Sequence, residues 1–161
     1  MKTQSGFTLI EMVAVIIILA IMAATALPKF TNLTGEARYA SLNGLSGGLR
    51  SAAALSRSKW LAAMSANQAT VDFNGTGVTV ISAATPGSSV NNQGYPLGAP
   101  LGMELAMDSL STYTSGIDAG DIVWWPNGVT NSTICYVKYI SSTGVVTITP
   151  TTTDLAAANC I

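Results

Sequence analysis

The first pattern along the chain is an apolar run close to its start. From residue 7 to residue 27 the only ionisable side chain is Glu11. About 20 apolar residues are enough to cross a bilayer as one helix, because each residue adds about 1.5 Å of rise. The sequence therefore predicts a transmembrane helix over residues 7–30. A carboxylate in such a helix costs free energy, so Glu11 should have a partner.

The pattern changes after this run. Pro28 has no N–H to donate to the carbonyl of Ala24, so we expect a helix break there. Over residues 31–64 apolar residues recur at intervals of three and four, which predicts the amphipathic half of a long helix. The buried face is expected to hold Leu42, Leu45, Leu49 and Ala52, and the basic residues lie elsewhere: Arg38, Arg50, Arg57 and Lys59. Three glycines weaken this helix, so they indicate close approach of another element or local bending: Gly44, Gly47 and Gly48.

Residues 65–161 carry the signals of a β-rich head. Asn74-Gly75 between residues 70–73 and 77–82 predicts a hairpin. Residues 83–102 are rich in Pro, Gly, Ser and Asn, which predicts a surface loop, and residues 103–113 fit a short helix with Met103, Ala106, Met107 and Leu110 inward. Three strand-like runs follow, at residues 121–125, 133–140 and 145–149. The expected fold is α+β, with a long helix packed on a small antiparallel sheet.

Composition excludes several function classes. Only 9% of residues are charged and the net charge is −1, so a basic surface for nucleic acid is not expected. The chain contains no histidine, which removes histidine-based catalysis and metal binding. Its two cysteines, Cys135 and Cys160, are predicted to form a structural disulfide outside the cytoplasm. The bond would close a loop of about 26 residues and stabilise the head by roughly 3.5 kcal/mol.

The head offers two weak candidates for binding. Four acids could supply oxygen ligands to Ca²⁺, but without EF-hand spacing they fit solvated surface positions better: Glu104, Asp108, Asp118 and Asp121. Trp124 and Trp125 could present an indole for sugar stacking, although neighbouring strand residues point to opposite faces and one should be core. No catalytic residue, cofactor site or metal site is predicted.

Glu11 is better explained by what precedes it. If the chain were cut between Gly6 and Phe7, a positive α-amino group would appear four residues before Glu11 and could pair with its carboxylate. One alternative is an ordinary secretory signal with Lys2 as its positive region and cleavage after Ala26. Another is a plain membrane anchor. Neither alternative gives Glu11 a role.

A short leader with one lysine ending in Gly6, then Phe-Thr-Leu-Ile-Glu, then an apolar helix, resembles the class III signal of type IV pilins. The resemblance implies a leader of residues 1–6, cleavage between Gly6 and Phe7 by a prepilin peptidase, and N-methylation of Phe7. It also implies that Glu11 docks each subunit into a growing filament. Residues 28–45 are similar, more narrowly, to pilins of the mannose-sensitive haemagglutinin (MSHA) type.

The same resemblance implies partners and location. The expected partners are other copies of the chain in a helical filament, an inner-membrane platform, a cytoplasmic assembly ATPase and an outer-membrane secretin. The precursor would lie in the inner membrane, and the fimbrium would extend outside a Gram-negative cell, where it supports adhesion or surface motility. A pseudopilin of a type II secretion system shares these N-terminal features and stays open as an alternative.

Overall fold

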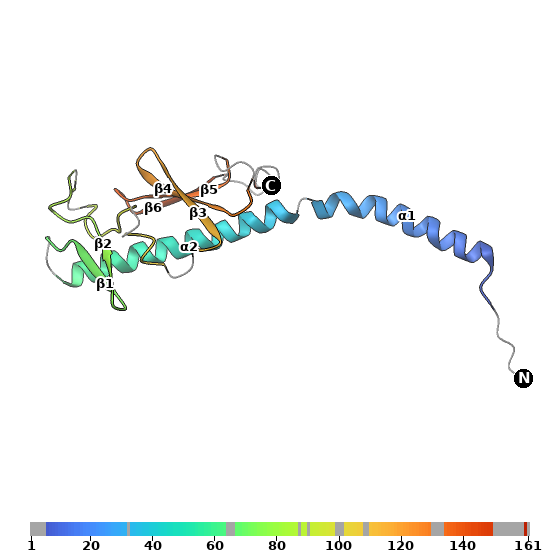
Figure 1. The fold of residues 1–161 in the computed structure, drawn as a ribbon, viewed down its shortest axis with the longest axis horizontal. Helices are drawn as coiled ribbons and strands as arrows, with labels where there is room; N and C mark the ends of the chain where they lie inside the picture. The colour runs from blue at the N-terminus through green and yellow to red at the C-terminus, as the bar shows by residue number, and fades with distance from the viewer. Residues whose placement is uncertain are drawn as a thin grey trace, which may run out of the picture.

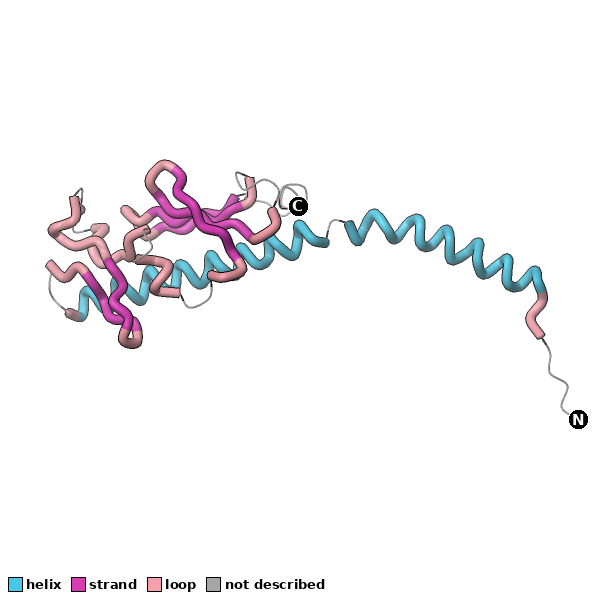
Figure 2. Tube along the Cα trace, in the orientation of Figure 1, coloured by secondary structure: helices cyan, strands magenta, loops and turns pink. Residues whose placement is uncertain are grey.

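The computed structural model describes residues 6–31, 33–63, 67–86, 88–89, 91–98, 102–107, 110–129, 134–149 and 160. Helix α1 spans Leu9–Thr31 and helix α2 spans Leu33–Ala62. Figure 1 shows α1 extending away from a head that is built along α2. All described strands lie alongside α2 and none lies alongside α1, as Figure 2 shows. The predicted α+β class is therefore confirmed.

Helix α1 has the length and composition of a membrane span. Residues Leu9–Leu27 have a mean hydropathy of 2.6, and none of this stretch is buried inside the protein. Large apolar side chains here are unusually exposed, for example Ile10 at 72% and Ile16 at 64%. Because water does not favour such exposure, this surface needs lipid or other apolar helices around it.

Helix α1 runs through Pro28, where the sequence predicted a break in the form of a kink or a locally opened turn. Helix α1 continues through Pro28 to Thr31, and α2 begins two residues later at Leu33. Proline removes one hydrogen bond, to the carbonyl four residues earlier, and helical φ values suit its ring. Because Pro28 lies in the last turn of α1, that single lost bond is compatible with the helical backbone.

Helix α2 supplies one wall of the core, as its periodicity predicted. Leu42 and Leu49 are fully buried, and Leu45 and Ala52 are at most 8% exposed. The facing wall is the inner face of the larger sheet, which contributes Ile122, Trp124, Val137, Tyr139 and Val146. A smaller cluster near the end of α2 joins Trp60 to Val71, Val78 and Val80.

Two antiparallel sheets form the head. The small sheet pairs β1 (Thr70–Phe73) with β2 (Thr76–Thr79) through a turn at Asn74 and Gly75. Both turn residues have positive φ, 53° and 89°, which is the two-residue hairpin geometry that Asn-Gly favours. The larger sheet has the order β3-β4-β5-β6, with bounds Tyr113–Asp118, Asp121–Pro126, Tyr136–Ile140 and Val145–Thr149. The predicted hairpin and antiparallel meander are confirmed.

The helix predicted over residues 103–113 was wrong in type: its described residues begin with a turn, and its last residue, Tyr113, is the first of strand β3. Residues 102–106 form only a turn, in which Ala106 N donates to Gly102 O at 3.3 Å. The inward residues were correct, since Met103 is fully buried and Ala106, Met107 and Leu110 pack partly buried around the core. Tyr113 begins a strand because its segment pairs along β4, an interaction between segments that local periodicity does not report.

The predicted loop over residues 83–102 is irregular but only partly superficial. Gln93 is 6% exposed and Pro96 is fully buried. Gly94 N donates to Ile81 O at 2.8 Å, and Val80 forms an isolated bridge with Pro96. The loop therefore closes the core between the two sheets, and its polar composition did not indicate that burial.

The basic side chains of α2 bind the head rather than facing water alone. Each one donates to a backbone carbonyl from a different segment: Arg38 to Cys160 at 3.0 Å, Arg50 to Val146 at 3.1 Å, Arg57 to Asn91 at 2.6 Å and Lys59 to Asp72 at 2.7 Å. These bonds tie the chain terminus, β6, the long loop and β1 to the same helix. The amphipathic pattern predicted that these residues lie away from the apolar face, but it did not predict their partners.

The three helix glycines fall into two groups. A Cβ on Gly48 would approach the Met107 methyl group, so Gly48 admits the 102–107 turn. Gly44 and Gly47 have no other segment of the chain within 4 Å of that position. We therefore expect Gly44→Ala and Gly47→Ala each to raise the free energy of unfolding by about 0.5–1 kcal/mol, because alanine favours the helix.

Urea unfolding of the soluble head measures this effect. The contrasting variant is Gly144→Ala, where φ is +69° and a Cβ would clash with the ring of Tyr95. That change should lower stability. Loss of stability in Gly44→Ala would show that this helical glycine has a role inside the head.

Tyr139 gives the head a pH-dependent stability. Its hydroxyl is buried and donates to Pro96 O at 2.9 Å, and burial raises its pKa above the ordinary value. Above pH ~10 the unfolded chain loses this proton while the folded chain keeps it, so stability falls as pH rises. Tyr139→Phe should cost about 1 kcal/mol at pH 7 and make that alkaline fall less steep. Urea titrations between neutral and alkaline pH test this, and equal slopes in both proteins would contradict it.

Candidate functional site

The candidate site is the start of α1. Gly6, Phe7 and Thr8 are described and precede the helix, which begins at Leu9. Among the described residues, no other segment lies within 4 Å of a Cβ placed on Gly6, and Phe7 is 81% exposed. The bond between Gly6 and Phe7 is therefore accessible to a peptidase. Residues 1–5, which include Lys2, lie outside the described residues.

Glu11 has a partner that the sequence reasoning missed. One carboxylate oxygen accepts from Thr8 N at 2.8 Å and from Thr8 Oγ1 at 2.7 Å. In return, Thr8 Oγ1 accepts from Glu11 N at 3.3 Å. This is a capping box, in which residues three apart satisfy each other's backbone N–H groups at a helix start. The signal was visible as Thr8-x-x-Glu11 immediately before the apolar run.

The capping box gives the Glu11 carboxylate hydrogen-bond donors but does not neutralise its charge. Thr8 stabilises the carboxylate by hydrogen bonds, and the positive end of the helix macrodipole adds to this. Thr8 is neutral, so the carboxylate keeps its negative charge in an otherwise apolar helix. Among the described residues, the ion pairs found involve only Lys138, so Glu11 has no cation there. The box also fixes the carboxylate within one turn of the Phe7 nitrogen.

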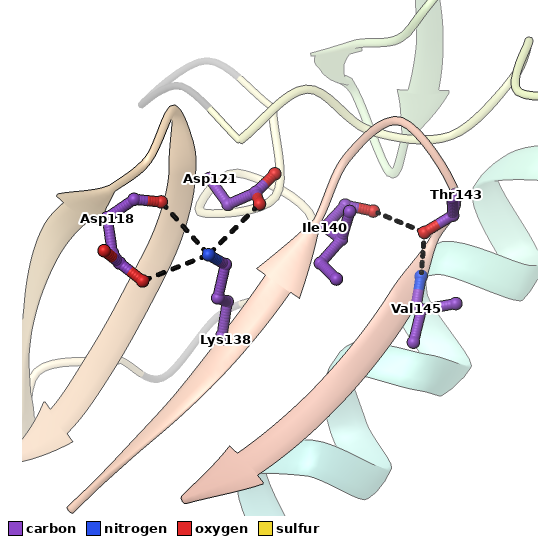
Figure 3. A network of polar contacts seen from close by, with 6 residues as sticks. All are labelled: Asp118, Asp121, Lys138, Ile140, Thr143 and Val145. Atoms are coloured by element: carbon purple, nitrogen blue, oxygen red, sulfur yellow. Dashed lines mark hydrogen bonds and ion pairs between the residues drawn. The ribbon is translucent and has the colours of Figure 1, made fainter. Parts of the chain in front are cut away.

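The acids proposed as calcium ligands have other partners. Lys138 Nζ lies 3.0 Å from Asp118 Oδ2 and 3.4 Å from Asp121 Oδ2, as Figure 3 shows. Hydrogen bonding to Asp118 raises the pKa of Lys138, so the ammonium persists and holds the position a cation would take. Glu104 is half-buried on the 102–106 turn, and Asp108 lies outside the described residues. Within those residues no group of three metal-binding side chains occurs.

The two tryptophans point to opposite faces of β4. Trp124 is 1% exposed and belongs to the core. Trp125 is half-buried, and its ring lies over Gly116 on β3, where a Cβ would come within 2.8 Å of it. The expectation that at least one tryptophan is core is met by Trp124. Trp125 is left as the weak candidate for sugar stacking.

Cys135 and Cys160 form a disulfide, with Cα atoms 5.2 Å apart. Both are fully buried. Cys135 comes just before β5, and the backbone carbonyl of Cys160 accepts the bond from Arg38. The chain terminus is thus attached both to the sheet and to α2.

The candidate site lies within a stretch that matches a known family model. Residues 1–27 match the family model described as the prokaryotic N-terminal methylation motif. The chain carries this motif. Its matched range contains Gly6, Phe7, Thr8 and Glu11, together with most of α1.

A second match extends beyond the motif. The chain is 44% identical over 50 residues to the type IV narrow pilus major component PilA5 of Thermus thermophilus. That stretch is 31% of this chain and 43% of the relative's own length. Neither match is to an enzyme family, and the α+β arrangement is pilin-like. No solved structure matches the chain.

Proposed function

We propose that this protein is the structural subunit of a type IV pilus filament, processed after Gly6 and assembled through α1. The observation that carries the proposal is Glu11, a charged residue in the first turn of an apolar helix, within the range that matches the methylation motif. The relative named as a pilus component supports it. These features favour assembly of α1 into a helix bundle over a catalytic function.

The mechanism follows from the surface of α1. A prepilin peptidase cuts between Gly6 and Phe7 on the cytoplasmic side, and Phe7 is N-methylated. The helix is stored in the inner membrane and then moves into a bundle of identical helices, exchanging lipid contacts for packing among aliphatic side chains. A head-to-tail contact that does not close on itself produces a fibre.

Glu11 sets the register of this assembly. The new amino group at Phe7, on the same or a neighbouring subunit, pairs with the carboxylate that the capping box has already oriented. A subunit docked out of register would bury the charge without its partner, and such a charge is costly in an apolar bundle. The charge therefore selects one axial position of the subunit, whereas apolar packing alone would allow several.

The remaining partners follow the same proposal. They are the inner-membrane platform, the assembly ATPase and, in a Gram-negative cell, the outer-membrane secretin. Adhesion or surface motility would be the output of the filament. The likeness of residues 28–45 to MSHA-type pilins supports assigning the chain to that branch.

The deciding experiment is the intact mass and first residue of the protein in material sheared from cells. The expected product begins at methylated Phe7 and is found in long extracellular fibres. A product beginning at Leu27 would identify a secreted soluble protein instead. Correct processing at Phe7 without long extracellular fibres would favour a pseudopilin of a type II secretion system.

A further inference from the structure

A groove opens beside the far end of α2. It lies between the helix, the β1–β2 hairpin and the 102–107 turn, and is lined by Leu55, Lys59, Phe73, Thr76, Leu105 and Ala106. Its volume is about 280 Å³. Ligand pockets for small molecules usually measure about 300–1,000 Å³ and enclose most of the ligand. This groove is smaller, and its apolar residues stay open to solvent, with Leu55 49% and Leu105 37% exposed.

The head also carries an apolar side chain that its own fold leaves uncovered. Ile117, near the tip of the β3–β4 hairpin, is 79% exposed, the largest value among the large hydrophobic residues described after α1. It pairs across the sheet with Ile122, which is 4% exposed and belongs to the core. Directly paired residues share a face. The apolar inner face of the sheet therefore continues beyond the part that this chain covers.

The charges beside these two features are complementary. Ile117 is followed by Asp118, which with Asp121 and Lys138 forms a group of two carboxylates and one ammonium with a net charge of −1 (Figure 3). The groove has Lys59, whose Nζ contacts the Asp72 carbonyl and lies 4.7 Å from the centre of the Phe73 ring. Neither contact neutralises the ammonium. Within the described residues no carboxylate forms an ion pair with Lys59.

We propose that the groove binds the β3–β4 hairpin tip of a second copy of this chain, with Ile117 between Leu55, Leu105 and Phe73. Figure 1 shows the β3–β4 turn and the β1–β2 turn on opposite sides of α2. One head therefore cannot fill its own groove, but two neighbouring heads can engage in sequence. Because the two patches differ, each copy in a docked pair uses one patch and leaves the other free. A further copy can dock at each end, so the contact continues along a fibre. This inference rests on the proposed filament and specifies how its heads meet.

Cysteine cross-linking of filaments tests the contact. A chain carrying Ile117→Cys and Leu55→Cys should give, after oxidation in sheared filaments, a ladder of covalent multimers that a reductant removes. Each single variant should give no ladder. The control pair Val145→Cys with Leu55→Cys should also give none, since Val145 is 47% exposed but lies at the start of β6. The chain's own cysteines are already joined to each other.

The outcomes separate this inference from the proposed function. Absence of fibres from the unmodified protein would defeat the filament proposal itself. Fibres that contain the Ile117 and Leu55 cysteines but give no ladder would overturn the groove contact alone. If the double-cysteine variant does not assemble, the fibre yield of single variants provides the test. Ile117→Ser should lower the fibre yield about tenfold, because the contact loses an apolar side chain. Ile117→Leu and Val145→Ser should keep it, and an unchanged yield in Ile117→Ser would overturn the contact.

Discussion

Replacing Glu11 with valine is expected to abolish fibre formation while cleavage after Gly6 continues. The proposed cleavage point precedes α1 and is exposed, so a peptidase would not need the carboxylate for access. Valine makes α1 more apolar, so membrane insertion should also persist. What is lost is the charge that, in the proposed assembly, pairs with the Phe7 amino group and fixes the register between subunits. Fibre yield is measured in sheared material, and processing is measured by the mass of the membrane-bound chain.

Two further variants distinguish the charge of Glu11 from its capping role. Glutamine can replace glutamate in a capping box but carries no charge. Thr8→Ala removes the hydroxyl that Glu11 binds and leaves the carboxylate in place. If the charge sets the register, Glu11→Gln should lose fibres as Glu11→Val does. Thr8→Ala should assemble, with a helix start weakened by about 1 kcal/mol.

The opposite pattern would contradict the pairing mechanism. Normal fibres from Glu11→Gln together with few from Thr8→Ala would show that Glu11 acts by starting the helix. Normal fibres from Glu11→Val would remove both roles. All of these variants should keep the head unchanged, because among the described residues the side chains of Glu11 and Thr8 form hydrogen bonds only within this pair.

Removing the Cys135–Cys160 disulfide is expected to destabilise the head strongly. The sequence separation is 25 residues. Closing such a loop lowers the entropy of the unfolded chain, which raises the free energy of that state by about 3.5 kcal/mol at 25 °C. For a head of this size the melting temperature should fall by roughly 10–20 °C. Thermal unfolding of the soluble head, with and without reductant, measures the change.

Arg38→Met is the matched control for the disulfide. Its Nη1 donates to the carbonyl of Cys160, so this variant loses the other attachment of the chain terminus and keeps the covalent one. One hydrogen bond from a charged donor contributes about 1.5–3 kcal/mol at most. The reduced protein should therefore melt below Arg38→Met. A reduced protein as stable as the oxidised one would show that the disulfide adds nothing to the noncovalent contacts of Cys160, which include its bond from Arg38.

Local sequence was sufficient for the elements whose signals are local. The spacing of Leu42, Leu45 and Leu49 placed one face of α2 in the core, and Asn74-Gly75 placed the hairpin turn. Strand β3 was missed because its residues are mostly exposed and include Gly116, so it shows no alternation. Its conformation comes from pairing with β4, a partner that the sequence does not announce.

The candidate site was found by the same local signals, with one omission. Gly6, Phe7 and Glu11 lie within a single short motif, so their positions could be read directly from the chain. The bond between Glu11 and Thr8 is also local and could have been read from their spacing of three.

The sequence by itself determined the apolar stalk, the amphipathic helix, the hairpin and the motif at Gly6, since each depends on residues near one another in the chain. Only the tertiary structure decided which carbonyls the basic residues of α2 bind, that Asp118 and Asp121 hold Lys138, and that Ile117 and the Leu55 groove stay uncovered. The reason is that a side chain's partner depends on how distant segments meet, and composition leaves those meetings open until the core packs.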